Sequence, residues 1–265
     1  MRPVASLPMY DHPGVRVATD AWWAALAGAL RARGVASPPA LDREADYAGP
    51  WLDPGLVLSQ TCGYPYVTRL RGRVQLVATP VYRAPGCEGA RYSSVLVVRE
   101  DDPARALADL RGRRVAFNCT GSQSGHNALR RAVAPLAGNG RYFAGRVVTG
   151  SHLASAAAVA SGAADLCAID CVTWAMFARY QPQLIARLRL LGYTPSAPGL
   201  PLISALGAPL DRIRDALAAI MADPGLAATR EALLLEGLEL LDDAAYDEIL
   251  RMEEEAGGFG YAELA

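Results

Sequence analysis

Short apolar runs alternate along the chain with turns of small polar residues and with stretches of helical periodicity. Between residues 15 and 33, Trp22, Leu26 and Leu30 recur at helical spacing before Gly34. The apolar runs predict strands over 4–9, 56–65, 74–82, 92–99, 147–150, 164–170 and 188–194, and at the start of 113–127. Helices are predicted over 15–33, 102–110, 151–162 and 211–221, from the turn at 122 to about 136, from 171 onward, and through 241 and 255.

This alternation of strand and helix predicts an α/β protein with mostly parallel sheets. Two breaks rich in proline and glycine, near 84–90 and 193–200, divide the chain so that its two ends share one lobe. We therefore expect lobe 1 over 1–84 and 198–265, lobe 2 over 90–192, and hinges at 85–89 and 193–197. Such a layout with two crossovers implies a hinge and a ligand cleft.

Composition narrows the class of protein. The 265 residues, 28.0 kDa and 52% apolar content are enough for one large domain or two modest ones. A formal net charge of −1 argues against binding to nucleic acid. The sequence has no run typical of a membrane span or a signal peptide. We expect a cytoplasmic protein if Met1 is the native start, and a periplasmic one if a leader has been removed.

Five cysteines stand at positions 62, 87, 119, 167 and 171, an odd number without a CxxC motif. The spacing of Cys167 and Cys171 falls at a predicted strand end, where it does not form a metal pair. Small buried thiols are the favoured interpretation, so no metal site is expected.

The stretch 113–127 predicts a strand, a turn and the first turn of a helix. Gly121 and Gly125 flank Ser-Gln-Ser and let the backbone come close to a ligand. Ser122 or Ser124 fits the N-cap position, and the N–H groups of a first helical turn favour an anion. The alternative interpretation is an ordinary capped loop between strand and helix.

Polar groups follow several of the predicted strands at their carboxyl ends. They include Tyr10, the segment 60–64 with Tyr64, the segment 122–125 and the segment 170–173. Open α/β sheets bind ligands at those ends. Tyr92 and Ser93 beside a hinge, and His152 at a helix start, are expected to face the same cleft.

Several segments together resemble a known family. They are Tyr-Ser-Ser-Val at 92–95, Leu-Arg-Gly-Arg-Arg-Val-Ala-Phe-Asn at 110–118, Ser-Gln-Ser-Gly at 122–125, Gly-Ser-His at 150–152 and Gly-Ala-Ala-Asp-Leu at 162–166. Over about 4–205 the chain resembles the phosphate, phosphite and phosphonate solute-binding proteins of ABC importers, the PhnD-like group. The resemblance implies a type II periplasmic-binding-protein fold, with two α/β lobes, two hinge strands and a ligand clamped by closure.

The resemblance also implies a set of ligand-binding residues. These are Ser122, Gln123, Ser124 and Gly125 for the oxyanion, Tyr92 on the hinge strand, His152 at a helix start and Asp170 after a strand, with Tyr10 and Tyr64 lining the first lobe. The family commonly has a hydroxyl residue where Gln123 stands, and an amide can still donate a hydrogen bond.

Each of these residues also has a structural interpretation. The two serines fit helix caps, His152 fits a buried histidine that donates to a carbonyl, and Asp170 fits the N-cap of the following helix. Tyr92 fits either a packing role at the hinge or one wall of the ligand site.

The function expected from these features is binding of a small oxyanion, a phosphonate or phosphate-like compound, as the solute-binding component of an ABC importer. A permease is then the implied partner, the protein is a monomer, and neither a cofactor nor a catalytic residue is expected. One alternative is a cytoplasmic enzyme of the menaquinone- or thiamine-precursor type on the same fold. The other is a ligand-sensing module.

Overall fold

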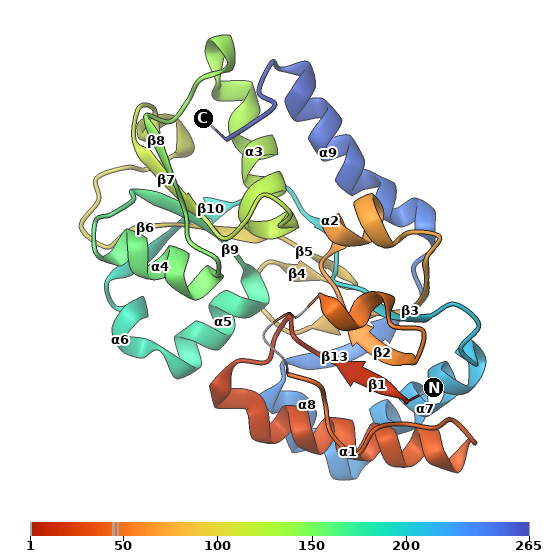
Figure 1. Cartoon of the computed structure of the whole chain (residues 1–265). Helices are drawn as coiled ribbons and strands as arrows, with labels where there is room; N and C mark the ends of the chain where they lie inside the picture. The colour runs from red at the N-terminus through yellow and green to blue at the C-terminus, as the bar shows by residue number, and fades with distance from the viewer. Residues whose placement is uncertain (1, 44–45, 47, 265) are drawn as a thin grey trace. The chain divides into compact units, whose positions relative to one another are not determined.

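A computed structural model describes residues 2–43, 46 and 48–264 (Figure 1). The chain forms two compact units, Met1–Arg83 with Gly199–Ala245, and Ala84–Pro198 with Tyr246–Ala265. Residues 1 and 265, at the ends of the predicted lobe 1, and residues 44, 45 and 47 within it lie outside the described residues.

The first unit is built on a five-stranded sheet with the order β1-β2-β12-β3-β13. Its strands are β1 (Val4–Ser6), β2 (Leu56–Gln60), β3 (Val74–Tyr82), β12 (Leu202–Ala205) and β13 (Leu235–Glu239). Strands β1 and β2 are parallel, whereas β12 and β13 run antiparallel to their neighbours. The two strands contributed by the later part of the chain therefore join the sheet in reverse direction.

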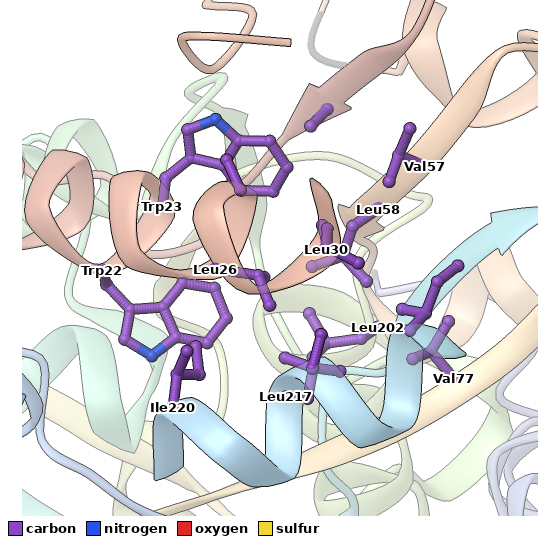
Figure 2. Packing of buried hydrophobic residues seen from close by; sticks show 14 of the residues in the cluster. Trp22, Trp23, Leu26, Leu30, Val57, Leu58, Val77, Leu202, Leu217 and Ile220 are labelled. Atoms are coloured by element: carbon purple, nitrogen blue, oxygen red, sulfur yellow. The ribbon is translucent and has the colours of Figure 1, made fainter. Parts of the chain in front are cut away.

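The helices of the first unit are α1 (Arg16–Ala32), α2 (Gly63–Pro65), α7 (Leu210–Ala222) and α8 (Ala227–Ala232). Helix α1 buries Trp22, Leu26 and Leu30 at helical spacing, as the sequence predicts. Figure 2 shows this stripe facing strand residues such as Leu58 and the buried side of α7, including Leu217. The core of the first unit lies between the sheet and these two helices.

The second unit contains a five-stranded sheet with the order β10-β6-β9-β7-β8 and a small sheet with the order β11-β5-β4. The larger sheet consists of β6 (Ser94–Arg99), β7 (Arg114–Phe117), β8 (Gly145–Val148), β9 (Leu166–Asp170) and β10 (Leu188–Tyr193). The small one consists of β4 (Cys87–Glu88), β5 (Arg91–Tyr92) and β11 (Ala197–Pro198). Strand β7 is parallel to both β8 and β9, and β6 is antiparallel to β9 and β10.

The helices of the second unit are α3 (Ala128–Val133), α4 (His152–Ala160), α5 (Cys171–Tyr180), α6 (Pro182–Ile185) and α9 (Asp247–Gly258). A π-helical turn, Gln123–Asn127, leads directly into α3. The core of this unit contains Leu129 and Val133 from α3 and Ala256 from α9, together with strand residues such as Phe117. Helix α9 lies beside α3 in Figure 1.

Several features differ from the sequence prediction. Residues 235–239, within a predicted helix, form strand β13, and residues 63–65, at the end of a predicted strand, form α2. Both large sheets are mixed rather than mostly parallel. The predicted helix over 102–110 is reduced to a 3-10 turn, Leu107–Leu110. The C-terminal segment from Tyr246 clusters with the second unit rather than the first, because α9 buries Ile249, Met252 and Ala256 and contacts α3 and β11 there.

Candidate ligand-binding site

Three helix starts lie at one edge of the large sheet in the second unit. The parallel strands β7, β8 and β9 are each followed by a helix, namely the π turn with α3, then α4, then α5. The loops after β7 and β8 are joined where the Gly150 N–H donates to the Asn118 carbonyl at 2.9 Å. The first N–H groups of a helix have no acceptor within the helix, and its dipole is positive at this end. The helix starts after β7 and β8 therefore favour an anion, whereas the start of α5 is already capped by the Asp170 carboxylate.

Ser122 is the N-cap of the first of these helices. Its backbone is extended, with φ −90° and ψ 130°, and its Oγ accepts a hydrogen bond of 3.0 Å from the Gly125 N–H. The capping interpretation from the sequence is thus realised. A capping hydroxyl still carries its own proton, so Ser122 can donate to a ligand while it accepts from Gly125.

Gln123 is fully buried, and its side chain points into the second unit. Its Nε2 donates to Sδ of Met252 at 3.2 Å, and its Oε1 accepts from Nδ2 of Asn127 at 2.7 Å. The amide is therefore used in packing the loop against α9. A contact between Gln123 and a ligand would run through the backbone instead of the side-chain amide that the sequence suggested.

Ser124 and His152 connect two of the helix starts. The Ser124 Oγ and the His152 Nε2 are 2.9 Å apart, and the Ser124 carbonyl accepts from Oγ of Ser94 at 2.9 Å. Burial lowers the pKa of His152 to about 4, and a backbone hydrogen bond with Ala168 offsets this only in part. The imidazole is consequently neutral at pH 7, and its Nε2 is placed to exchange a proton with the serine hydroxyl.

Gly125 is required by close packing. A Cβ at this position would overlap Oδ1 of Asn118 and would lie 3.3 Å from Cε1 of His152. The Oδ1 atom of Asn118 is buried and has no hydrogen-bond partner among the residues that the structure describes. Asn118 was missed as a site residue, although an asparagine directly after a buried strand and before a glycine-rich turn was the available signal. Ser94, which anchors Ser124, was missed as well, and no sequence pattern marked it.

Asp170 caps α5. Its Oδ1 accepts from the N–H groups of Val172 and Thr173 at 2.8 and 3.0 Å, and the residue is 3% exposed. The structure thus realises the N-cap alternative for this carboxylate. Asp170 also pairs with Ser94 across β9 and β6, which places it at the same strand ends as the Ser94–Ser124 hydrogen bond.

Tyr92 is the last residue of β5 in the small sheet, and Ser93 connects it to β6. Tyr92 is 4% exposed and pairs with Cys87 on one side and Ala197 on the other. The Ser93 carbonyl accepts from the Cys171 N–H at 3.2 Å, so Ser93 lies beside the start of α5. Both residues therefore belong to the second unit and lie near Asp170.

Tyr10 and Tyr64 belong to the first unit. The ring of Tyr10 meets the ring of Tyr82 edge to face, with centroids 4.9 Å apart and an interplanar angle of 77°. Tyr64 lies in α2, and its carbonyl accepts from Oγ1 of Thr68 at 2.7 Å. Their role in a ligand site remains a prediction.

Among the residues that the structure describes, no group of three or more His, Cys, Asp or Glu side chains could hold a metal ion. Within the same part of the chain, none of the helices is long and apolar enough to span a membrane.

The fold defines a class of protein, an α/β protein of two compact units with three helix starts at one edge of a sheet. The family described as ABC transporter, phosphonate, periplasmic substrate-binding protein matches residues 57–246, which is most of the chain. The chain belongs to this family. No curated protein matches it.

Solved structures of similar fold come from several bacteria. A binding protein component of an ABC phosphonate transporter from Pseudomonas aeruginosa is 18% identical, with a TM-score of 0.76 over 98% of this chain and 88% of that chain. PhnD1 from Prochlorococcus marinus (MIT 9301), in complex with methylphosphonate, is 15% identical, with a TM-score of 0.74 over 97% and 98%. A Xanthomonas citri protein bound to ATP is 18% identical, with a TM-score of 0.69 over 98% of each chain.

At these identities the structural likeness establishes the fold alone. Together with the family match it confirms the α/β periplasmic-binding-protein fold and the PhnD-like family that the sequence predicted. The family is a substrate-binding part of transporters and not a group of enzymes. The enzyme and sensor alternatives are therefore not favoured.

Proposed function

We propose that the chain binds a phosphonate and that the phosphoryl oxygens lie at the start of the helix after β7. In this proposal the hydroxyls of Ser122 and Ser124 and the backbone N–H groups of the first helical turn donate to the ligand. Methylphosphonate, which PhnD1 of Prochlorococcus marinus holds in its solved structure, is the natural first candidate.

The hydrogen bond between Ser124 and His152 is the observation that carries this proposal. It brings a hydroxyl from one helix start to an imidazole from the next, at the sheet edge where three helix dipoles end. A bound dianion would favour the protonated imidazole, because an opposite charge nearby raises the pKa of a histidine. His152 would then change from a neutral partner of Ser124 to a cationic partner of the ligand.

Asp170 limits which ligands fit. An ionised carboxylate near a dianion is repulsive unless hydrogen atoms lie between them. The two backbone N–H groups that donate to its Oδ1 already stabilise part of its negative charge. A ligand with an amino or hydroxyl group close to the phosphonate could donate to this carboxylate, whereas the methyl group of methylphosphonate cannot.

Isothermal titration calorimetry with methylphosphonate, phosphite, phosphate and sulfate tests the assignment. We expect binding of at least one phosphorus oxyanion and a weaker response to sulfate. Ser124→Ala should weaken that binding by about 1–3 kcal/mol, because a charge-assisted hydrogen bond is lost. Ser161→Ala is a matched control, since that hydroxyl caps the other end of α4 on the Ala158 carbonyl.

If Ser124→Ala binds the ligand with unchanged affinity, and circular dichroism shows that the variant is folded, then the Ser124 hydroxyl does not contact the ligand. Ser122→Ala is a less specific test of ligand binding, because it also removes the hydrogen bond that caps the Gly125 N–H and can lower the free energy of unfolding by about 1 kcal/mol. Its affinity should therefore be read at a temperature at which the variant is fully folded.

We further propose an ABC permease as the protein partner and the periplasm as the working compartment. Both follow from the family, whose members are periplasmic components of transporters. Fractionation of cells that express the full gene, with a tag at the C-terminus, tests the compartment.

A further inference from the structure

Two cysteines from distant parts of the sequence meet in the second unit. Cys87 lies in β4 and is half-buried, and Cys171 is the buried first residue of α5. They are 84 positions apart, yet their Sγ atoms are 3.4 Å apart. Both are free thiols in the structure. The ligand-binding proposal uses neither of them.

Backbone hydrogen bonds hold the two cysteines in place. The Ser93 N–H donates to the Gly86 carbonyl at 2.8 Å, and the Ser93 carbonyl accepts from the Cys171 N–H at 3.2 Å. Cys87 also pairs with Tyr92 in the antiparallel β4–β5 ribbon. Ser93 thus links the turn before Cys87 to the helix that begins at Cys171. This backbone arrangement brings the two residues together, and their side-chain conformations set the final distance between the sulfurs.

Gly86 allows the turn to approach α5. Its φ is +101°, which L side chains rarely adopt, and a Cβ there would lie 3.0 Å from Cβ of Cys171. A sulfur–sulfur bond is about 2.05 Å long, so the two Sγ atoms must approach by a little over an ångström. Small rotations about the side-chain bonds can supply this movement without breaking the Ser93 hydrogen bonds.

The two thiols are not equally reactive. The pKa of Cys171 is raised by its hydrogen bond with Cys87, by burial and by the nearby carboxylate of Asp170. Cys87 is the more exposed of the two and is therefore the thiol that an external reagent reaches first. The family is periplasmic, and disulfides form and persist in that compartment.

We propose that Cys87 and Cys171 form a disulfide bond, by exchange with a disulfide oxidant of the small-molecule or protein type. The thiolate of Cys87 attacks the oxidant and releases one thiol, which leaves a mixed disulfide on Cys87. Cys171, as its proton leaves, then attacks the Cys87 sulfur and releases the second thiol. The two cysteines lose two electrons and two protons in total, and the oxidant gains them as two thiols.

The bond would fasten the turn at 84–90 to the start of α5. This turn contains one of the two predicted hinges, 85–89, and Ser93 and Asp170 adjoin its attachment point. Closing a long loop removes conformational entropy from the unfolded chain, so the oxidised protein should be the more stable form. We expect its melting temperature to exceed that of the reduced protein by about 5–10 °C.

Peptide mapping of the oxidised protein tests the assignment directly. The purified chain is incubated with oxidised glutathione, free thiols are blocked with iodoacetamide, and the protein is cut with trypsin and Asp-N. Asp-N cuts before Asp170 and separates Cys171 from Cys167, while trypsin cuts after Arg83 and Arg91. The expected product is peptide 84–91 linked to peptide 170–179, lighter than the two free peptides by two hydrogens. The peptides with Cys62, Cys119 and Cys167 should carry the blocking group.

Variants connect the bond to stability. Cys87→Ser and Cys171→Ser should each abolish the linked peptide and the difference in melting temperature between oxidised and reduced samples. Cys62→Ser, in the first unit, should keep both. Glutathione retained on Cys87 without the cross-link, a different cysteine pair, or equal melting temperatures with and without reductant in the wild-type protein would overturn the proposal. The mapping involves no phosphonate, so its result is independent of the ligand assignment.

Discussion

The hydrogen bond between Ser124 and His152 couples the charge of an imidazole to a hydroxyl at a helix start. A neutral imidazole accepts at one ring nitrogen and donates at the other, whereas a protonated one donates at both. In the tautomer whose Nε2 accepts from Ser124, protonation of His152 would reverse the direction of this bond and free the serine proton for another acceptor. We propose that a bound phosphonate induces the same change.

Two buried histidines make folding stability depend on pH. Burial lowers the pKa of His126 and of His152 from 6.5 to about 4. The unfolded chain therefore takes up protons as the pH falls below 6.5, while the folded chain does not until about pH 4. The stability that these residues contribute is fully present above 6.5 and is lost between 6.5 and 4.

We expect the free energy of unfolding to fall by about 1 kcal/mol per histidine between pH 7.5 and 5.5. Urea titrations at both pH values measure it. The double variant His126→Gln with His152→Gln should flatten the difference. His12→Gln should keep most of it, because His12, whose pKa burial also lowers, is only partly buried. A wild-type protein equally stable at both pH values would contradict this account.

Gly125 tests how tightly the loop after β7 is packed. Gly125→Ala would drive a methyl group into Oδ1 of Asn118. Because the Asn118 side chain, whose Oδ1 is buried, would have to move, we expect about 1–3 kcal/mol of lost stability and at least tenfold weaker binding of methylphosphonate. Thermal unfolding and calorimetry measure the two effects.

A second substitution distinguishes this steric explanation from a general sensitivity of the loop. Asn118→Ala in the Gly125→Ala background removes Oδ1 of Asn118, the atom that the new methyl group would overlap, and should restore most of the stability. Gly121→Ala is the matched control, because a Cβ at that position meets nothing within 4 Å. Failure of the double variant to recover would show that the packing around Gly125 is not limited by Asn118.

At the scale of elements, α9 stabilises the helix that carries the candidate site. Asn127, which is fully buried, donates to the Ile249 carbonyl of α9 at 3.0 Å and to Oε1 of Gln123 at 2.7 Å. Its Oδ1 accepts from Arg130 at 2.9 Å, and Arg130 also pairs with Glu253 of α9. The C-terminal helix α9 thus stabilises the π turn and α3 through this hydrogen bond and this ion pair.

Asn127→Ala should therefore destabilise the second unit strongly. The substitution leaves the Ile249 carbonyl and the Gln123 amide buried with one partner fewer, at a cost of about 2–4 kcal/mol in total. Amide hydrogen exchange resolved by peptide should show faster exchange in α3 and α9, while α1 of the first unit keeps its protection. Gln183→Ala, at an exposed position in α6, is the control and should change neither.

Strand β13 was not predicted, because 235–239 lies within a predicted helix. Most other elements and their order could be predicted from the sequence, because buried strands are continuous apolar runs and α1 has a regular stripe. The direction of β6, β12 and β13 could not, since a strand's apolar pattern is the same whichever way its neighbour runs. The pattern of α9 likewise shows an apolar face with Ile249, Met252 and Ala256 but not the unit on which that face packs.

The same limit applies to the candidate site. The Ser122 cap and the alternative cap at Asp170 follow from local sequence, and the structure contains both. The burial of the Gln123 amide depends on Met252, 129 positions away, and the anchoring of Ser124 depends on Ser94, 30 positions away. Local patterns carry no information about such partners, so these roles required the folded chain.

At the scale of the whole molecule, the chain passes between its two units near residues 83, 198 and 245. The first two of these crossings lie at or beside the predicted hinges at 85–89 and 193–197. The third adds a connection that the sequence prediction lacked, because the segment from Tyr246 returns to the second unit. A motion between the units would therefore have to be accommodated by three connections instead of two.

We expect a bound phosphonate to bring the two units closer, as the proposed clamping of ligand between lobes requires. Small-angle X-ray scattering with and without saturating methylphosphonate measures this as a decrease in the radius of gyration. Ser124→Ala at the same ligand concentration should show a smaller decrease if its affinity falls below saturation, and the wild-type change should return when more ligand is added. Identical scattering profiles for wild-type protein that calorimetry shows to be saturated would mean that the ligand is held within one unit, by the helix starts at the edge of the second sheet alone.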